Sequence, residues 1–353
     1  MTRSTMGGGL ATSLACCAWF GCGDGSSASG QVAEAAARVD GGAGAVYAAK
    51  GPLATDRCVV FAGSAACVAP SDGGSPDAGA ADALYEVFYP AAIASISGRA
   101  PLLTWGNGTA ATPDQYSILL THLASWGFVV VASTSANTGT GSEMLAGEDA
   151  IVAADADPTS VFYGRLDVAS IGAIGHSQGA DGAAHALLGA DAPGSGHAFI
   201  KTLVSIEPPG QQWTCFGSSD PSCPTAQSFD ASSLRYGSVF FVDGSKDLLI
   251  APPTQAASTL GEQSVAAYYA ATPASTARAK ATRIGADHND IQDHCAVGVA
   301  CAGVGPTGYL GYITAWLRYQ LAGDAAAALA FRGPAPDIHS DRAWEDAEQA
   351  SLP

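Results

Sequence analysis

Short apolar runs alternate with segments of helical periodicity along most of the chain. The apolar runs predict strands at residues 83–90, 101–105, 127–132, 171–174, 202–206, 238–242 and 281–284. Apolar residues at helical spacing predict helices at residues 116–126, from about 180 onward, at 255–271 and at 309–321, with Gly323 as the last stop. Strands that alternate with such helices form right-handed βαβ units. The pattern therefore predicts an α/β fold, with a mostly parallel central sheet flanked by helices on both faces.

Both ends of the chain differ in composition from this central part. Residues 1–22 carry a single charge, Arg3, ahead of a small and mildly apolar stretch, which is typical of a signal peptide. Residues 23–46 consist mainly of Gly, Ala and Ser, so they predict a flexible linker. Residues 332–353 are acidic with few apolar side chains, and we expect a loose tail there. One folded domain is thus predicted over residues 47–331.

The end of the signal peptide resembles the junction of a bacterial lipoprotein. Cys22 follows a small residue, Gly21, and opens the Gly-rich linker, as the lipidated cysteine does in that class; Cys16 forms a rival junction. We therefore expect an exported protein that is secreted or held at the cell surface. Membrane attachment through a lipidated cysteine and release of the cleaved chain are the two alternatives.

Six further cysteines fall into three close pairs in the sequence. The pairs are Cys58 with Cys67, Cys215 with Cys223, and Cys295 with Cys301. In an oxidising compartment, the simplest arrangement joins each cysteine to its near neighbour in a disulfide, and free structural thiols are the alternative. None of the spacings is that of a zinc finger, so they predict no metal site.

Composition and charge exclude several classes of function. The 353 residues include 15 Lys and Arg against 32 Asp and Glu, and the formal net charge of -17 is unsuited to neutralising nucleic-acid phosphates. Hydrophobic residues make up 48% and charged residues 13%, so the chain can bury a core. After the signal peptide, no stretch is apolar for the roughly 18 residues of a membrane span. We expect a monomer without a nucleic-acid partner.

A Gly-x-Ser-x-Gly motif stands between a predicted strand and a predicted helix. It reads Gly175-His176-Ser177-Gln178-Gly179. In this context the motif forms a turn so tight that the flanking residues must lack side chains, and the turn projects the serine hydroxyl at the carboxyl edge of the sheet. We therefore predict that Ser177 is a nucleophile.

A serine nucleophile needs a base and an acid, and the loops after the last two predicted strands offer both. His288 follows the final strand and is the candidate base, with His294 as the alternative. Asp243 and Asp247 follow the strand before it. We select Asp247 because it lies in the loop that can reach across to the histidine, whereas Asp243 sits on the strand end, where it is placed to stabilise the turn.

Backbone amides must also stabilise the oxyanion that forms when a serine attacks a carbonyl group. Gln178, directly after the nucleophile, supplies one amide. We expect the second from the glycine-rich loop after the strand at 101–105, where Thr109 is our choice and Gly108 or Asn107 are alternatives. Residues that flank the nucleophile or lie in the loop at 211–223 could contact substrate. The candidate substrate-binding residues are Gly108, His176 and Trp213.

Together with these motifs, three further strings resemble the α/β-hydrolase family. Residues 123–130 (Leu-Ala-Ser-Trp-Gly-Phe-Val-Val), the run at 247–252 and Gly-Ala-Asp-His at 285–288 are similar to the bacterial cutinase-like, polyester-hydrolysing and dienelactone-hydrolase-like branch. The similarity covers residues 84–321. It implies an α/β-hydrolase fold, a triad of Ser177, Asp247 and His288, and a reaction without metal or organic cofactor.

One departure from that branch concerns the end of the strand at 202–206. Glu207-Pro208-Pro209 stands where the polyester hydrolases tend to carry Pro-Trp, part of an aromatic platform. We expect an exported serine carboxylic-ester hydrolase that acts through an acyl-enzyme on neutral short-to-medium-chain esters or polyesters. The alternatives are a lipase or acyltransferase with the same triad, and a non-catalytic, surface-anchored binding module of the same fold.

Overall fold

A nine-stranded sheet forms the centre of the part of the chain that the structure describes. The structure is a computed structural model, and it describes residues 42–61, 64, 66–68, 84–213, 229–258, 261–294 and 303–353. The strands are β1 (Thr55–Phe61), β2 (Leu84–Pro90), β3 (Ala100–Gly106), β4 (Val129–Ser133), β5 (Leu166–His176), β6 (Ile200–Ile206), β7 (Ser238–Gly244), β8 (Ala277–Arg283) and β9 (Trp344–Ala350). Their order is β1-β2-β4-β3-β5-β6-β7-β8-β9. Pairs from β4 to β8 are parallel, whereas β1–β2, β2–β4 and β8–β9 are antiparallel. The predicted α/β class with a mostly parallel sheet is confirmed.

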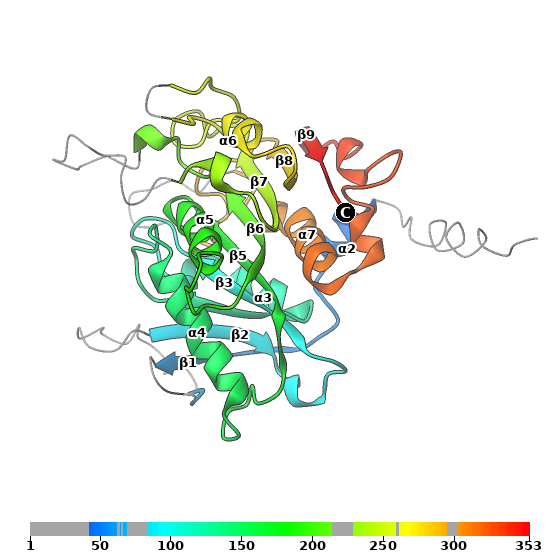
Figure 1. Ribbon diagram of the computed structural model, residues 1–353. Helices are drawn as coiled ribbons and strands as arrows, with labels where there is room; N and C mark the ends of the chain where they lie inside the picture. The colour runs from blue at the N-terminus through cyan, green and yellow to red at the C-terminus, as the bar shows by residue number, and fades with distance from the viewer. Residues whose placement is uncertain are drawn as a thin grey trace, which may run out of the picture. The chain divides into compact units, whose positions relative to one another are not determined.

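Helices cover both faces of this sheet, as the sequence predicts. One face carries α2 (Gly42–Ala48), α3 (Ser117–Ser125), α7 (Leu310–Ala322) and the short α8 (Ala325–Ala328), and the other carries α4 (Ser142–Ala156), α5 (Gln178–Ala190) and α6 (Val265–Ala271). Figure 1 shows α4 and α5 to the left of the central strands and α7 to the right. Consecutive residues of β3 point to opposite faces, so Leu103 packs with the first group and Leu102 with the second. The central strands are thus buried on both sides.

Helix α7 is anchored to β6 by one buried hydrogen bond. The indole nitrogen of Trp316 donates to Thr202 Oγ1 at 2.8 Å, and both side chains are fully buried. The helix ends at Gly323, whose φ of 63° is the left-handed conformation expected of a glycine stop. Because buried donors and hydroxyls must find partners, this bond fixes the position of α7 on the sheet.

The apolar pattern misses α4 and overstates the length of α6. Helix α4 buries Gly147 and Glu148 beside a few large apolar residues, so its hydrophobic period is weak. Helix α6 begins at Val265 rather than at 255. Its start is fixed by Ser264, whose hydroxyl accepts the backbone amide of Ala267 at 3.1 Å, and serine is a favoured residue at this position.

The acidic C-terminal segment is ordered, which corrects the expected loose tail at 332–353. Strand β9 pairs antiparallel with β8 at the edge of the sheet. The Lys280 ammonium of β8 donates to the backbone carbonyl of Asp346 at 2.8 Å and lies 2.9 Å from Glu348 Oε1. Acidic composition suggested disorder, but an edge strand needs little apolar surface when a cation on the neighbouring strand pairs with it.

The last residues of the predicted linker at 23–46 also belong to the folded part. Helix α2 covers Gly42–Ala48 and packs against α7 through two glycines, because a Cβ atom on Gly311 would lie 2.2 Å from the carbonyl oxygen of Gly44. The signal peptide, both candidate lipidation junctions and the rest of the linker lie outside the described residues.

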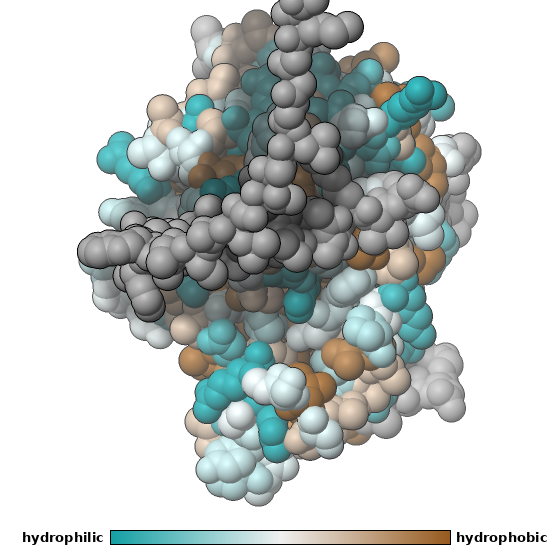
Figure 2. Space-filling view, turned by 90° about the vertical axis from the view of Figure 1, so that its right-hand side faces the viewer, coloured by the Kyte–Doolittle hydropathy of each residue, from teal (hydrophilic) through white to brown (hydrophobic). Residues whose placement is uncertain are grey.

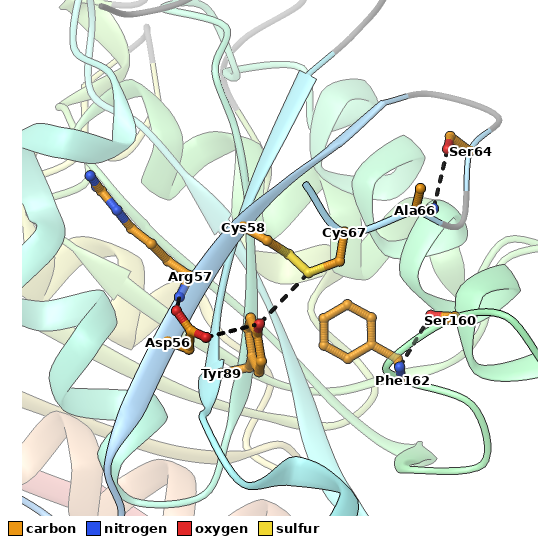
Figure 3. Close-up of a disulfide and its surroundings, with 9 residues drawn as sticks. All are labelled: Asp56, Arg57, Cys58, Ser64, Ala66, Cys67, Tyr89, Ser160 and Phe162. Atoms are coloured by element: carbon orange, nitrogen blue, oxygen red, sulfur yellow. Dashed lines mark hydrogen bonds between the residues drawn. A yellow bond between two sulfur atoms is a disulfide. The ribbon is translucent and has the colours of Figure 1, made fainter. Parts of the chain in front are cut away.

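A disulfide joins Cys58 and Cys67, as the near-neighbour pairing predicts. Figure 3 shows this bond beside Tyr89, whose hydroxyl lies 3.8 Å from Cys67 Sγ and donates to Asp56 Oδ2 at 3.5 Å. The ring of Tyr89 meets the edge of Phe162 at a centroid distance of 5.2 Å. The disulfide therefore ties Cys67 to β1, which carries Cys58. The other two predicted pairs, at 215–223 and 295–301, lie outside the described residues.

No helix among the described residues is long and apolar enough to cross a membrane. On the face seen in Figure 2, hydrophobic and hydrophilic residues are interspersed where the coloured surface is visible. This mixture is ordinary for a folded domain in contact with water.

Glu148 on α4 makes the stability of the fold depend on pH. Its side chain is fully buried, and burial, followed by the neighbouring charge of Asp149, raises the pKa of Glu148 from 4.5 to about 8. Between these two pH values the unfolded chain has lost this proton while the folded chain retains it. The free energy of unfolding must therefore fall as pH rises, by up to about 1.4 kcal/mol per pH unit.

We expect Glu148→Gln to remove this dependence, because the amide is always neutral. The variant and the parent should melt at similar temperatures at pH 5, and the variant should melt several degrees higher at pH 8. Thermal unfolding followed by circular dichroism at both pH values measures this. Glu143→Gln on the same helix, where the carboxyl reaches solvent, is the matched control; equal pH slopes for parent and Glu148→Gln would contradict the assignment.

Candidate active site

Ser177 occupies a strained turn between β5 and α5. Its φ of 53° and ψ of -126° are unfavourable for a residue with a side chain, and its amide donates to the carbonyl of Ile206 on β6 at 2.9 Å. The turn closes only because both flanking positions are glycine. A Cβ on Gly175 would lie 2.0 Å from the carbonyl oxygen of Gly179, and one on Gly179 would lie 2.1 Å from that of Gly106. The sequence thus folds into the predicted sharp turn.

The structure brings the predicted serine, histidine and aspartate together. His288 Nε2 lies 2.8 Å from Ser177 Oγ, and His288 Nδ1 lies 2.5 Å from Asp247 Oδ2. The three residues follow β5, β8 and β7, at the carboxyl ends of parallel strands. The serine hydroxyl therefore has a base within hydrogen-bond distance, and the base has a carboxylate on its other nitrogen.

Asp247 is held as an anion by backbone amides. Its carboxylate accepts from the amides of Ile250 at 2.9 Å and Ala251 at 3.0 Å, as well as from His288. Burial alone would raise the pKa of Asp247, but the hydrogen bond and charge of His288 and the two amides outweigh it and lower the pKa. An ionised Asp247 can stabilise the imidazolium that forms when the histidine takes a proton.

The rival acid and the rival base lie elsewhere. Asp243 is fully buried on β7, where it pairs in register with Thr282 of β8, and burial raises its pKa well above the usual value. The side chain of His294 is 60% exposed and lies 3.6 Å from Asp114. Neither residue contacts Ser177 or His288 within the described part of the chain.

Two backbone amides of the predicted oxyanion loop, those of Gly108 and Thr109, differ in whether they are already hydrogen-bonded. The amide of Gly108 donates to the Tyr116 hydroxyl at 3.0 Å, so it is already engaged. The side chain of Asn107 holds the loop by donating to the carbonyl of Ser133 at 2.7 Å. The amide of Thr109 makes no hydrogen bond within the described residues, so it stays a candidate donor beside that of Gln178.

His176 lies behind the triad and is completely enclosed by protein. Its Nδ1 is 2.9 Å from the Tyr116 hydroxyl, and its Nε2 is 2.7 Å from the carbonyl oxygen of His288. Burial, and next the charge of His288, lower the pKa of His176 to about 3, so the ring stays neutral. A neutral ring can accept from Tyr116 and donate to the His288 carbonyl. This chain of bonds fixes the base to the oxyanion loop, and it places His176 away from direct contact with substrate.

Trp213 lies next to the loop that carries the acid. Its indole nitrogen donates to the carbonyl of Leu249 at 2.7 Å, and the side chain is half-buried. The segment from Thr214 to residue 228 lies outside the described residues. Contact of Trp213 with substrate stays a prediction.

Glu207 is a member of the site that the sequence reasoning did not place there. It follows β6 directly and is fully buried. Its Oε1 accepts from the Tyr309 hydroxyl at 2.6 Å, while its Oε2 lies 3.4 Å from His176 Nε2 and 3.5 Å from His288 Nδ1. Burial, followed by the charge of Asp247, raises the pKa of Glu207 well above its usual value. The sequence did offer one signal for this residue. Glu207 directly follows β6, and β6 lies between β5, which precedes Ser177, and β7, which precedes Asp247.

His176, Glu207 and His288 are also a cluster whose ligand atoms lie within 4.8 Å of one another, as a metal site requires. The ring nitrogens that face Glu207 are engaged, since His176 Nε2 meets the His288 carbonyl and His288 Nδ1 meets Asp247. The donor set therefore fits a hydrogen-bond network better than a cation.

Comparison of the chain with profiles of known protein families finds no match, and comparison with curated proteins finds no similar sequence. The geometry of the site is therefore the basis for a functional assignment.

Proposed function

We propose that the chain is a serine carboxylic-ester hydrolase with the α/β-hydrolase fold. The observation that supports this most is the continuous series from Asp247 to His288 to Ser177, with distances of 2.5 and 2.8 Å. The chain order of serine, acid and histidine is that of this fold, and the strained turn at the serine has the form of its nucleophile elbow.

In the proposed reaction Ser177 Oγ attacks the ester carbonyl carbon while its proton moves to His288 Nε2. Asp247 stabilises the resulting imidazolium through Nδ1, and the amides of Gln178 and Thr109 stabilise the oxyanion. The imidazolium then returns the proton to the leaving alcohol, and an acyl-enzyme remains on Ser177. A water molecule then attacks the acyl carbon while His288 takes one of its protons. The imidazolium returns that proton to Ser177 Oγ as the acyl–oxygen bond breaks, which releases the acid and restores the serine.

Neutral esters with apolar parts are the proposed substrates. Leu248 and Leu249, next to the acid, are 75% and 63% exposed, so they offer apolar contact at the edge of the site. Glu207 is buried, and it stands where the polyester hydrolases tend to carry an aromatic platform. We therefore favour small or aliphatic esters over aromatic polyesters. Export, with release or attachment through a lipidated cysteine, remains a proposal from residues 1–22.

A serine-reactive fluorophosphonate probe and a series of p-nitrophenyl esters, from acetyl to palmitoyl, test this function. We expect the purified protein to hydrolyse the shorter esters and to carry the probe on Ser177. Ser177→Ala should lose both properties while its circular dichroism spectrum is unchanged. An optimum at palmitoyl would favour the lipase alternative. Folded protein that neither hydrolyses any ester nor takes the label would favour the binding module.

A further inference from the structure

We propose that Glu207 is a second acid for the catalytic histidine, a positioning residue that faces the same nitrogen of His288 as Asp247 and takes over its role when Asp247 is absent. The inference rests on the proposed ester hydrolysis and deepens it. It assigns a role to a buried carboxyl group that the reaction described above does not use.

The two carboxyl groups reach His288 Nδ1 from neighbouring strands. Asp247 comes from the loop after β7, and its Oδ2 lies 2.5 Å from the nitrogen. Glu207 comes from the end of β6, and its Oε2 lies 3.5 Å from it. That Oε2 is buried and makes no hydrogen bond within the described residues. A carboxyl oxygen without a hydrogen-bond partner in the described part of the chain therefore lies just beyond hydrogen-bond distance of the base.

The backbone at Glu207 is strained, and the contacts around it hold it in this conformation. Its φ of 51° is left-handed, although it is not a glycine and precedes Pro208. Its amide donates to the carbonyl of Val242 on β7 at 2.6 Å, and Tyr309 binds its Oε1. Glycine would adopt this conformation with less strain, so the property that glutamate adds here is the carboxyl group.

Glu207 does not compete with Asp247 in the intact site. Asp247 accepts three hydrogen bonds and stays ionised, whereas burial and the charge of Asp247 keep the proton on Glu207. The other titratable groups that act on Glu207 are His176, Tyr309, Asp243 and Asp290. Loss of Asp247 removes the nearest negative charge and leaves the Nδ1 proton of His288 without its acceptor. Burial still raises the pKa of Glu207, but the imidazolium that His288 becomes during the reaction lies next to its Oε2 and favours the ionised carboxylate. A shift of about 0.6 Å then completes a normal hydrogen bond to Nδ1.

A double-mutant cycle on ester hydrolysis measures this replacement. A serine triad that loses its only acid typically loses about 10⁴-fold in kcat. Because Glu207 substitutes, we expect Asp247→Ala to lose only about 10-fold to 100-fold, and Asp247→Ala with Glu207→Gln to lose the full amount, about 10⁴-fold. Glu207→Gln alone should lower kcat by a few-fold. A full loss in Asp247→Ala, with no further loss in the double variant, would overturn the proposal.

Matched variants separate the role of Glu207 from general damage to the site. Asp243→Asn removes a buried carboxyl that does not face His288, so Asp247→Ala with Asp243→Asn should be as active as Asp247→Ala. Asp247→Asn, which retains an acceptor for the Ile250 or Ala251 amide, replaces Asp247→Ala should the alanine variant not fold. An effect of Asp243→Asn as large as that of Glu207→Gln would contradict the assignment.

A measurement that does not depend on catalysis keeps this inference apart from the proposed function. The Nδ1 proton of His288, bound to a carboxylate, should give a low-field proton resonance in the ¹⁵N-histidine-labelled protein. We expect this resonance to persist in Asp247→Ala and to disappear when Glu207→Gln is added. Its loss in Asp247→Ala alone would sink the inference even if the parent is an active esterase. If the resonance persists in Asp247→Ala but the parent protein hydrolyses no ester, the contact between Glu207 and His288 stands and the proposed function is rejected.

Discussion

His288→Ala should lower kcat for a short p-nitrophenyl ester by about a millionfold, because removing the base leaves Ser177 as an ordinary alcohol. The expected loss is this large because serine and histidine act as one unit, and neither contributes to bond formation without the other. What remains should come from substrate binding and the oxyanion amides. Steady-state hydrolysis at saturating ester, with folding checked by circular dichroism, gives the value.

His294→Ala is the matched control for this experiment. The two histidines lie on the same stretch of chain, but His294 is exposed and faces Asp114, so its removal should change kcat by no more than about twofold. A variant at 294 that loses activity, beside one at 288 that retains it, would reassign the base and break the proposed triad.

Gly179→Ala should destabilise the protein by more than about 4 kcal/mol, an exceptional value for one added methyl group. The new Cβ would lie 2.1 Å from the carbonyl oxygen of Gly106 and 2.6 Å from that of Asn107. Both are backbone atoms at the end of β3, so the clash cannot be relieved by rotating a side chain. Either α5 moves away from the sheet or the variant unfolds, and both outcomes displace Ser177.

Gly189→Ala is the control for Gly179→Ala. It tests whether the loss of stability comes from the clash with the end of β3 or from placing any alanine in α5. Position 189 is on the same helix, but an added Cβ would meet only the side-chain end of Leu145, at 3.0 Å. Alanine is also the better helix former by about 1 kcal/mol, so this variant should unfold within about 1 kcal/mol of the parent. Chemical denaturation of both variants measures the difference. Similar free energies of unfolding for Gly179→Ala and Gly189→Ala would contradict the close approach of α5 to the end of β3.

The proximity of Ser177, His288 and Asp247 could be predicted because the signals are local and the strand order is regular. The Gly-x-Ser-x-Gly string specifies the turn at Ser177, and a histidine or aspartate just after a buried parallel strand must lie at the same edge of the sheet. The choice of Asp247 over Asp243 also agrees with the contact to His288, because a residue in the loop can turn toward the histidine while a residue on the strand cannot.

The supporting residues could not be predicted, because their partners are distant in the sequence. Nothing near Tyr116 indicates that its hydroxyl binds both Gly108 and His176, yet this contact removes the Gly108 amide from the oxyanion candidates. The left-handed backbone of Glu207 could not be predicted either, because neither glutamate nor its neighbours in the sequence favour a positive φ. Such positions depend on the packed structure rather than on local preference.

Composition misled where an element depends on a few specific contacts. The segment of β9 has the acidity of a disordered tail, but Lys280 on the neighbouring strand pairs with it. The start of α2 has the Gly and Ala content of a linker, and the same small residues allow it to approach α7 closely. In both cases the average composition of the segment does not reveal the few contacts that order it.

The contact between α2 and α7 determines where a mechanical load would enter the folded part. Any pull on the chain ahead of Gly42 reaches α2 first and passes to α7 where Gly44 meets Gly311. Helix α7 begins directly after Tyr309, whose hydroxyl holds Glu207 beside the base. Tension in the N-terminal segment would therefore have a route through α7 and Tyr309 to the carboxyl of Glu207 that lies beside His288.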